Sequence, residues 1–264
     1  MPRKLMKPVL ILVILFGVVR SAPAQIVNTL SGFSDVPAWS GVAEATFAQS
    51  SGNTDVLTLG AAGKVQWQSP ARPESAWGHR VRLLGGVSRT DVNGNTAVDS
   101  SMGHLRDLHR LRPWISTLAF AQIQRDRFQR LRSRLLVGAG FQFDPVQRSN
   151  WSLSLGAAHM VEREDIRDVN EPKHAQRLST YLYWHGDLTD SKTVGVNVTG
   201  FYQPRWSDLG DVRANGAAEL TARLGPVVTL GLVASLQNNS RPPTNVKATD
   251  WRYQTRLTFN IPRQ

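Results

Sequence analysis

The feature that most constrains this chain is a two-residue rhythm of apolar and polar side chains that recurs in segment after segment. Between residues 57 and 67, one face carries Leu57, Leu59, Ala61, Gly63, Val65 and Trp67, and the other carries Thr58, Gly60, Ala62, Lys64 and Gln66. An amphipathic helix would repeat every three or four residues, whereas strict alternation is the pattern of a strand with one apolar face. The rhythm therefore predicts an all-β protein.

About twelve segments between turn signals share this rhythm. The expected strands are residues 38–50, 55–67, 76–89, 98–108, 113–124, 130–143, 150–161, 175–187, 191–203, 211–224, 226–238 and 248–262. Strands of globular proteins average about five or six residues, whereas a tilted strand that crosses a bilayer needs about nine to eleven. Bacterial barrels also use an even number of strands. Length and parity predict a single closed antiparallel transmembrane β-barrel of about twelve strands, with ten to fourteen left open because residues 98–108 are the least regular.

The tryptophans support the membrane interpretation. They fall near the ends of the expected strands, at Trp39, Trp67, Trp77, Trp114, Trp151, Trp184, Trp206 and Trp251. Amphipathic rings prefer the interface between lipid and water, where barrels carry aromatic girdles. The competing fold is a soluble periplasmic β-sandwich, which would gather these rings in the middle of its strands.

The connections between the expected strands suggest an orientation. Those after odd-numbered strands average roughly eight residues and those after even-numbered strands roughly five, and bacterial barrels have longer extracellular loops than periplasmic turns. With both termini in the periplasm, the odd-numbered connections would face outward.

The N-terminal residues predict export. Arg3, Lys4 and Lys7 precede an apolar run over residues 9–19, and residues 22–24 read APA, which is the pattern of a cleaved signal peptide. We expect a signal peptide over 1–24, a periplasmic segment over 25–37 and a barrel over 38–264, located in the bacterial outer membrane. The chain has no cysteine, so neither a lipoprotein anchor nor a disulfide is expected.

Several stretches resemble a known family. Residues 39–47 read WSGVAEATF and residues 51–55 read SGNTD, and the likeness continues through FQRLRSR at 128–134, GAGF at 138–141 and LGAA at 155–158. These stretches resemble the YdiY-type family of salt-induced outer-membrane proteins, whose biochemical role is unassigned. The resemblance implies an outer-membrane β-barrel and supplies no catalytic residues.

The strand parity points a set of basic side chains into the barrel. The candidates for an anion-binding lumen are Lys64, Arg80, Arg82, Arg130, Arg132, Arg134, Arg252 and Arg256. Glu44 and Glu219 are the expected counter-charges on the same face. An excess of guanidinium groups in a narrow lumen favours anions, which predicts a passive pore or a lumenal site for small anionic solutes. The alternative is a non-conducting barrel in which arginine and glutamate side chains brace the lumen.

Catalysis is not expected. The chain has six histidines, and none stands in a G-x-S-x-G or similar nucleophile motif. Ser154 and His159 have opposite parity, so they would face opposite sides of their strand. An outer-membrane lipid hydrolase is therefore a minor alternative, and no catalytic residue, cofactor or metal ligand is predicted.

The charge of the chain predicts its partners. Residues 162–168 read EREDIRD, which indicates a solvated extracellular loop that faces lipopolysaccharide. Once the signal peptide is removed, the net charge falls from +11 to about +7, and this basicity suits anionic lipid head groups better than nucleic acid. The expected partners are outer-membrane lipids, lipopolysaccharide, the barrel-assembly machinery and small anionic solutes.

Overall fold

The computed structural model describes residues 38–51, 55–70, 78–226 and 228–259, which form one antiparallel sheet of twelve strands in chain order. The strands are β1 (Ala38–Ser50), β2 (Val56–Gln68), β3 (His79–Val92), β4 (Asn95–Arg112), β5 (Ile115–Asp126), β6 (Leu131–Gln147), β7 (Trp151–Ile166), β8 (Lys173–Asp187), β9 (Val194–Arg205), β10 (Asp208–Arg223), β11 (Val228–Asn239) and β12 (Thr249–Phe259). The all-β prediction and the strand number are confirmed. The expected signal peptide and the segment 25–37 lie outside the described residues.

Every strand pairs with its neighbour in the sequence, so local hairpins build the whole sheet. A two-residue hairpin joins β3 and β4 through Asn93 and Gly94, whose φ angles are 50° and 77°. Asn-Gly is the favoured pair where two successive residues need positive φ, and the twist of that turn matches the twist of the strands it joins. No helix that could span a membrane occurs in the part of the chain that the structure describes.

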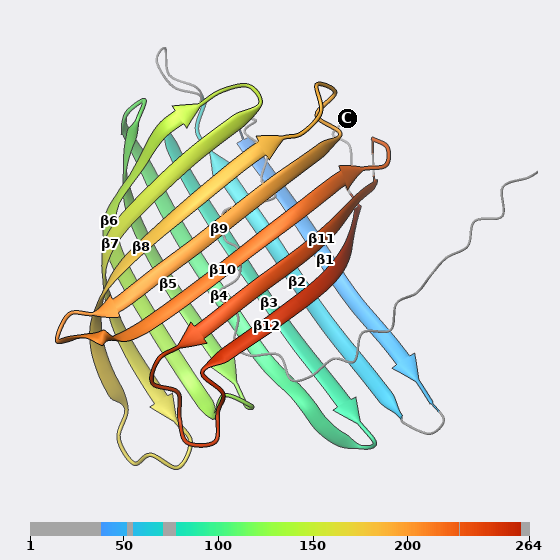
Figure 1. The fold of residues 1–264 in the computed structure, drawn as a ribbon, viewed down its shortest axis with the longest axis vertical. Helices are drawn as coiled ribbons and strands as arrows, with labels where there is room; N and C mark the ends of the chain where they lie inside the picture. The colour runs from blue at the N-terminus through green and yellow to red at the C-terminus, as the bar shows by residue number, and fades with distance from the viewer. Residues whose placement is uncertain (1–37, 52–54, 71–77, 227, 260–264) are drawn as a thin grey trace, which may run out of the picture.

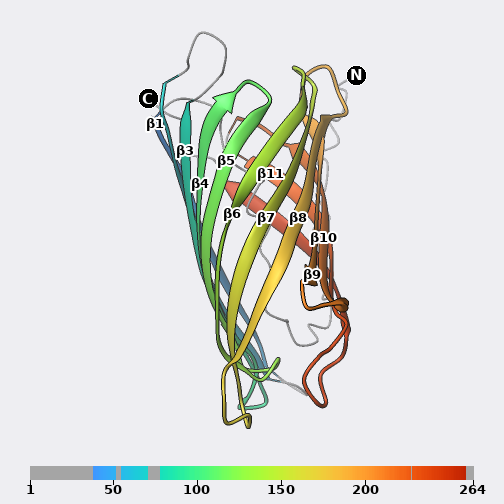
Figure 2. The same cartoon turned by 90° about the vertical axis from the view of Figure 1, so that its left-hand side faces the viewer.

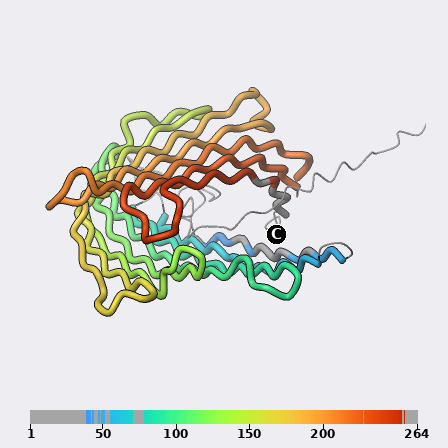
Figure 3. The backbone as a smooth tube through the Cα atoms, turned by 60° about the horizontal axis from the view of Figure 1, so that its bottom comes forward, coloured from blue at the N-terminus to red at the C-terminus, as the bar shows by residue number. Residues whose placement is uncertain are grey.

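The sheet curls into a half-barrel. Strands β1 to β5 form one wall and β9 to β12 form the facing wall, whose strands cross in front of the first wall in Figure 1. Strands β6 to β8 make the bend between the walls (Figure 2), and the end-on view in Figure 3 shows how strongly the sheet curves. Within the described ranges, no ladder joins β1 to β12, so the predicted closure is not part of the observed fold.

Burial is inverted relative to a soluble protein. Along β6, Leu135, Val137 and Phe141 are exposed on the outer face, while Arg134 and Gln142 are buried on the inner face. Exposed large apolar side chains recur along β1 to β12, and buried side chains are mainly polar or charged. A contiguous apolar surface of this kind marks contact with a membrane or a protein partner.

The inner face also holds a small apolar core. Leu108, Leu118, Ala158 and Tyr181 pack together there, with Phe120, Tyr183 and Phe201 around them. These residues come from β4, β5, β7, β8 and β9, so they hold the bend of the half-barrel together. The sequence analysis did not identify this core.

The loop lengths correct one expectation. The odd-numbered connections after β3 and β9 contain only residues 93–94 and 206–207, and the even-numbered connection after β4 contains only residues 113–114. Among the connections that the structure describes in full, the odd-numbered ones are therefore not consistently longer. Several residues that were expected in loops instead lengthen the strands, because each added residue pair forms further backbone hydrogen bonds.

We predict that a substitution by arginine on the outer face destabilises the protein strongly in the middle of a strand and only weakly in a connection. Val137 and Leu188 are 52% and 57% exposed, but Val137 lies mid-strand and Leu188 lies in a connection. In lipid, Val137→Arg should lower the free energy of unfolding by about 2–4 kcal/mol and Leu188→Arg by about 1 kcal/mol or less. Urea unfolding in phospholipid vesicles, followed by tryptophan fluorescence, measures both. Equal small effects would mean that water covers the outer face.

Candidate functional site

The inner face holds several of the predicted basic residues. Arg80, Arg82 and Arg134 are buried there, as is the expected counter-charge Glu219. Lys64 and Arg252 are half-buried. Glu44 lies on β1 and Arg256 on β12, and their side chains fall outside the described part of the chain.

Two predicted lumenal arginines do not lie on the inner face of a strand. Arg130 lies in the turn before β6 with a φ of 57°, where its Nη2 donates to Asp168 at 2.5 Å and its Nη1 donates to the carbonyl oxygen of Thr244, between β11 and β12, at 3.3 Å. The register shifts between Leu131 and Ser133 where β6 pairs with β7, which reverses the expected parity at this point. The side chain of Arg132 is consequently 56% exposed, at 3.7 Å from Asp165. Simple alternation fails here because a β-bulge adds a residue to one strand.

The inner face also holds charged residues that the sequence analysis missed. They are Arg106, Arg110, Arg177, Arg213, Asp126, Asp144, Glu162, Glu164 and Asp211. Residues 162–166, expected in an extracellular loop, belong to β7, and their alternation continues through Met160, Glu162 and Glu164. That continuing two-residue rhythm was the signal that could have placed both glutamates inside.

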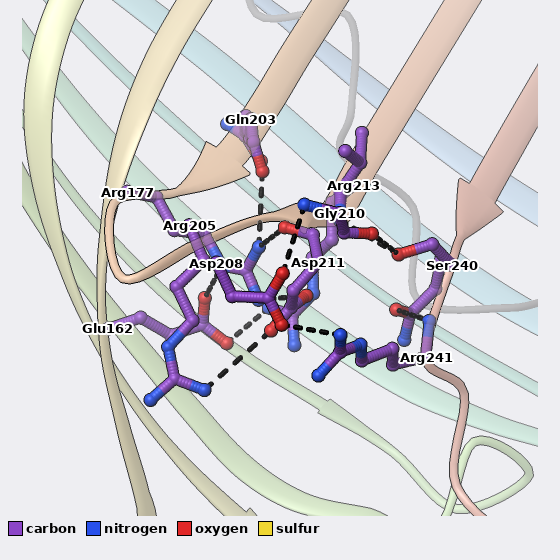
Figure 4. Close-up of polar contacts among 12 residues, drawn as sticks. Glu162, Arg177, Gln203, Arg205, Asp208, Gly210, Asp211, Arg213, Ser240 and Arg241 are labelled. Carbon is purple, nitrogen blue, oxygen red and sulfur yellow. Dashed lines mark hydrogen bonds and ion pairs between the residues drawn. The ribbon is translucent and has the colours of Figure 1, made fainter.

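The buried charges near the odd-numbered connections form a connected network (Figure 4). Glu162 on β7 accepts hydrogen bonds from Nε of Arg177 at 2.9 Å and from Nη1 of Arg213. Glu164 accepts from Nε of Arg134 at 2.9 Å and from Nη2 of Arg213 at 2.9 Å. Because β7 and β10 are not neighbours in the sheet, Arg213 bridges the interior rather than a ladder.

Arg177 extends the network to the start of β10. Its Nη2 donates to Asp211 Oδ1 at 2.9 Å, and its Nη1 donates to the carbonyl oxygens of Asp211 and Gln203 at 2.9 Å and 3.1 Å. Arg205 approaches the other carboxylate oxygen of Asp211 at 3.7 Å. Three buried arginines thus meet three buried acids, so this end of the interior is close to electrically neutral.

A second polar cluster lies near the even-numbered connections. Asp144 on β6 accepts from Arg110 Nη1 at 2.8 Å, from Gln142 Nε2 at 2.9 Å and from Ser154 Oγ at 2.5 Å. The hydroxyl of Tyr181 donates to Gln142 Oε1 at 2.6 Å. This cluster ties β4, β6, β7 and β8 together beside the apolar core.

Arginines dominate the same end on β3 and β4. Arg82 lies directly opposite Arg106 in the β3–β4 register. Nε of Arg82 donates to Gln66 Oε1, and Nε of Arg80 donates to Gln68 Oε1, both at 2.8 Å. With Arg110, four buried arginines occupy this half, where Asp144 and Glu219 are the buried acids among the described residues. Like charges directly opposite each other in a ladder are destabilising by themselves.

Nothing in the described side chains resembles a metal centre or a nucleophile with its base. No group of three or more histidine and acidic residues within the described ranges could hold a metal ion. Ser154 points inward to Asp144, whereas the ring of His159 accepts from Trp206 Nε1 at 3.1 Å on an exposed surface.

Comparison with known proteins gives a family and two distant structures. The family model described as "Protein of unknown function, DUF481" matches residues 43–261. No curated protein matches the sequence. A structure titled "NanC porin structure in rhombohedral crystal form" aligns with a TM-score of 0.48 and 7% identity, over 84% of this chain and 99% of that chain. A second, titled "Unveiling the Mechanism Behind the in-meso Crystallization of Membrane Proteins", aligns with a TM-score of 0.38 and 12% identity, over 84% and 82% of the chains.

We predict that Glu162 is essential to the network. Glu162→Gln leaves Arg213 and Arg177 without their shared carboxylate inside the protein, and breaking a buried ion pair from one side costs about 3 kcal/mol or more. The matched control is Asp168→Asn, which removes the exposed partner of Arg130 and should cost about 1 kcal/mol or less. Urea unfolding of the refolded protein measures both variants. A Glu162→Gln variant as stable as the control would show that the network does not brace the interior.

Proposed function

The chain belongs to the DUF481 family, and on that premise we propose that it spans the bacterial outer membrane as a closed β-barrel with a lumen that prefers small anions. The family match confirms the resemblance to the YdiY-type proteins. The observation that carries the proposal is the inverted burial, with polar side chains inside and large apolar side chains outside.

The lipid contact follows from the outer face. Exposed residues such as Phe47, Val87, Ile123 and Val137 come from four different strands, and the contact of this apolar surface with water is unfavourable. Contact with lipid removes that cost, but every backbone group must then pair within the protein. We therefore propose that β1 and β12 pair to close the sheet, because a sheet has no unpaired edge only when it closes.

The anion preference is supported by a group of buried arginines on the inner face. Arg80, Arg82, Arg106 and Arg110 gather near the even-numbered connections, and two donors of Arg106 have no acceptor among the described residues. A basic vestibule followed by a neutral, bridged narrowing would admit small anions and retard larger solutes. We propose passage or retention of solutes rather than catalysis, in keeping with the separation of Ser154 and His159.

The second candidate is a non-conducting barrel. The bridge from Arg213 on β10 to Glu162 and Glu164 on β7 favours it, because this bridge crosses the interior. In either case the partners proposed are outer-membrane lipids and lipopolysaccharide on the apolar face, and the barrel-assembly machinery during insertion. Export through removal of residues 1–24 belongs to the same proposal.

We predict a current carried mainly by chloride in planar bilayers under a potassium chloride gradient. Arg80→Gln combined with Arg82→Gln should lower the ratio of chloride to potassium permeability by roughly two- to fivefold, because two buried charges leave the vestibule. Arg125→Gln combined with Arg132→Gln, on the exposed surface, is the control and should leave the ratio unchanged. A reversal potential that favours potassium would contradict the anion preference, and a folded protein without current would favour the braced barrel.

A further inference from the structure

An interior cavity beside the apolar core is lined by hydrogen-bond donors. It has a volume of about 30 Å³, and its walls include His104, Arg106, Ser179, Tyr181 and Phe201. A buried water needs about 10–15 Å³ of such space, so the cavity suits one small ion and excludes a phosphate ester or a sugar. None of the described residues that line it is acidic.

Arg106 is the charged group of this cavity. It is only 2% exposed, and its Nε and Nη2 atoms have no hydrogen-bond acceptor in the described part of the protein. The guanidinium carbon lies 4.6 Å from the centre of the Tyr181 ring, which holds the side chain against the aromatic face. A buried donor without an acceptor is costly, and a charged one more so.

The buried carboxylate of Asp144 makes its hydrogen bonds to residues other than Arg106. Both oxygens of Asp144 are engaged, Oδ2 by Arg110 and Oδ1 by Gln142 and Ser154. Arg82 lies opposite Arg106 in the ladder and adds a second positive charge. The position therefore combines positive charge with unused donors.

One further side chain can complete an anion's coordination. Ser179 Oγ accepts from Gln203 Nε2 at 3.0 Å, which leaves its own hydrogen free to donate. His104 does not contribute a donor: its Nδ1 lies 3.0 Å from Oε1 of Gln122, whose Nε2 donates to Gln124, so the hydrogen of the neutral ring is on Nδ1.

We infer that this cavity is a binding site for a small inorganic anion of the chloride class, held by Arg106 with Ser179. The inference deepens the proposed function, on whose anion-preferring lumen it rests, by naming a place inside that lumen where an anion is held. Charge-assisted hydrogen bonds from a guanidinium are the strongest contacts such an ion can receive. Bromide, which is similar in size, competes for the site, and inorganic phosphate does not.

The test is the line width of the chloride-35 resonance in a titration of the full mature chain, refolded in detergent. We expect broadening that saturates and that bromide reverses. Arg106→Gln should weaken binding by about tenfold or more, because it removes the charge and two donors. Arg106→Lys keeps the charge and should bind within a few-fold of the natural protein. Arg132→Gln, an exposed arginine on β6, is the matched control and should bind normally.

The results distinguish a failure of the anion site from a failure of the proposed function. Absence of saturable broadening with the natural protein overturns the inference, and so does saturable binding that Arg106→Gln leaves unchanged. Binding is measured at equilibrium without a membrane, so the anion site can be present in a barrel that carries no current. Conversely, an anion-selective current without saturable binding would retain the proposed function and reject this site.

Discussion

Hydrocarbon offers no partner to a peptide N–H or C=O group, and this constraint organises the whole molecule. Twelve strands pair in chain order, so each peptide group in the interior of the sheet finds its partner in an adjacent strand. The same geometry sends alternate side chains to opposite faces, which lets one face meet lipid while the other meets polar neighbours. Val137 and Arg134, three residues apart on β6 with opposite parity, show both halves of that arrangement.

The inner face solves a different problem, which is how to bury many charges. Near the odd-numbered connections, Arg134, Arg177 and Arg213 meet Glu162, Glu164 and Asp211 in a network that spans non-neighbouring strands. Buried ion pairs add little net stability, but a broken pair is expensive, so such networks fix which walls face each other. Near the even-numbered connections, Arg80, Arg82, Arg106 and Arg110 lie on β3 and β4, where Asp144 and Glu219 are the buried acids among the described residues.

The strand pattern was predictable because period two is a local property of the sequence. Segments such as residues 38–50 match their strands fully, and most others match within a few residues. The inward placement of Arg80, Arg82 and Arg134 followed from the same parity. The continuation of β7 through Glu162 and Glu164 follows the same local rhythm and could also have been predicted. The bulge at Arg132 and the bridges of Arg213 could not, because they depend on which strands pair and which walls meet. The apolar core around Tyr181 was not predicted for the same reason, since its residues come from several strands.

Closure is the claim on which the membrane account depends most, and amide hydrogen exchange tests it directly. In phospholipid vesicles, peptides from Ala38–Ser50 and Thr249–Phe259 should exchange as slowly as peptides from Ile115–Asp126, because paired edges are protected like central strands. Exchange at both edges within minutes, while the central strand stays protected, would show an open sheet. An open sheet would leave the backbone groups of its edge strands unpaired in lipid, so that result would contradict a membrane-spanning barrel.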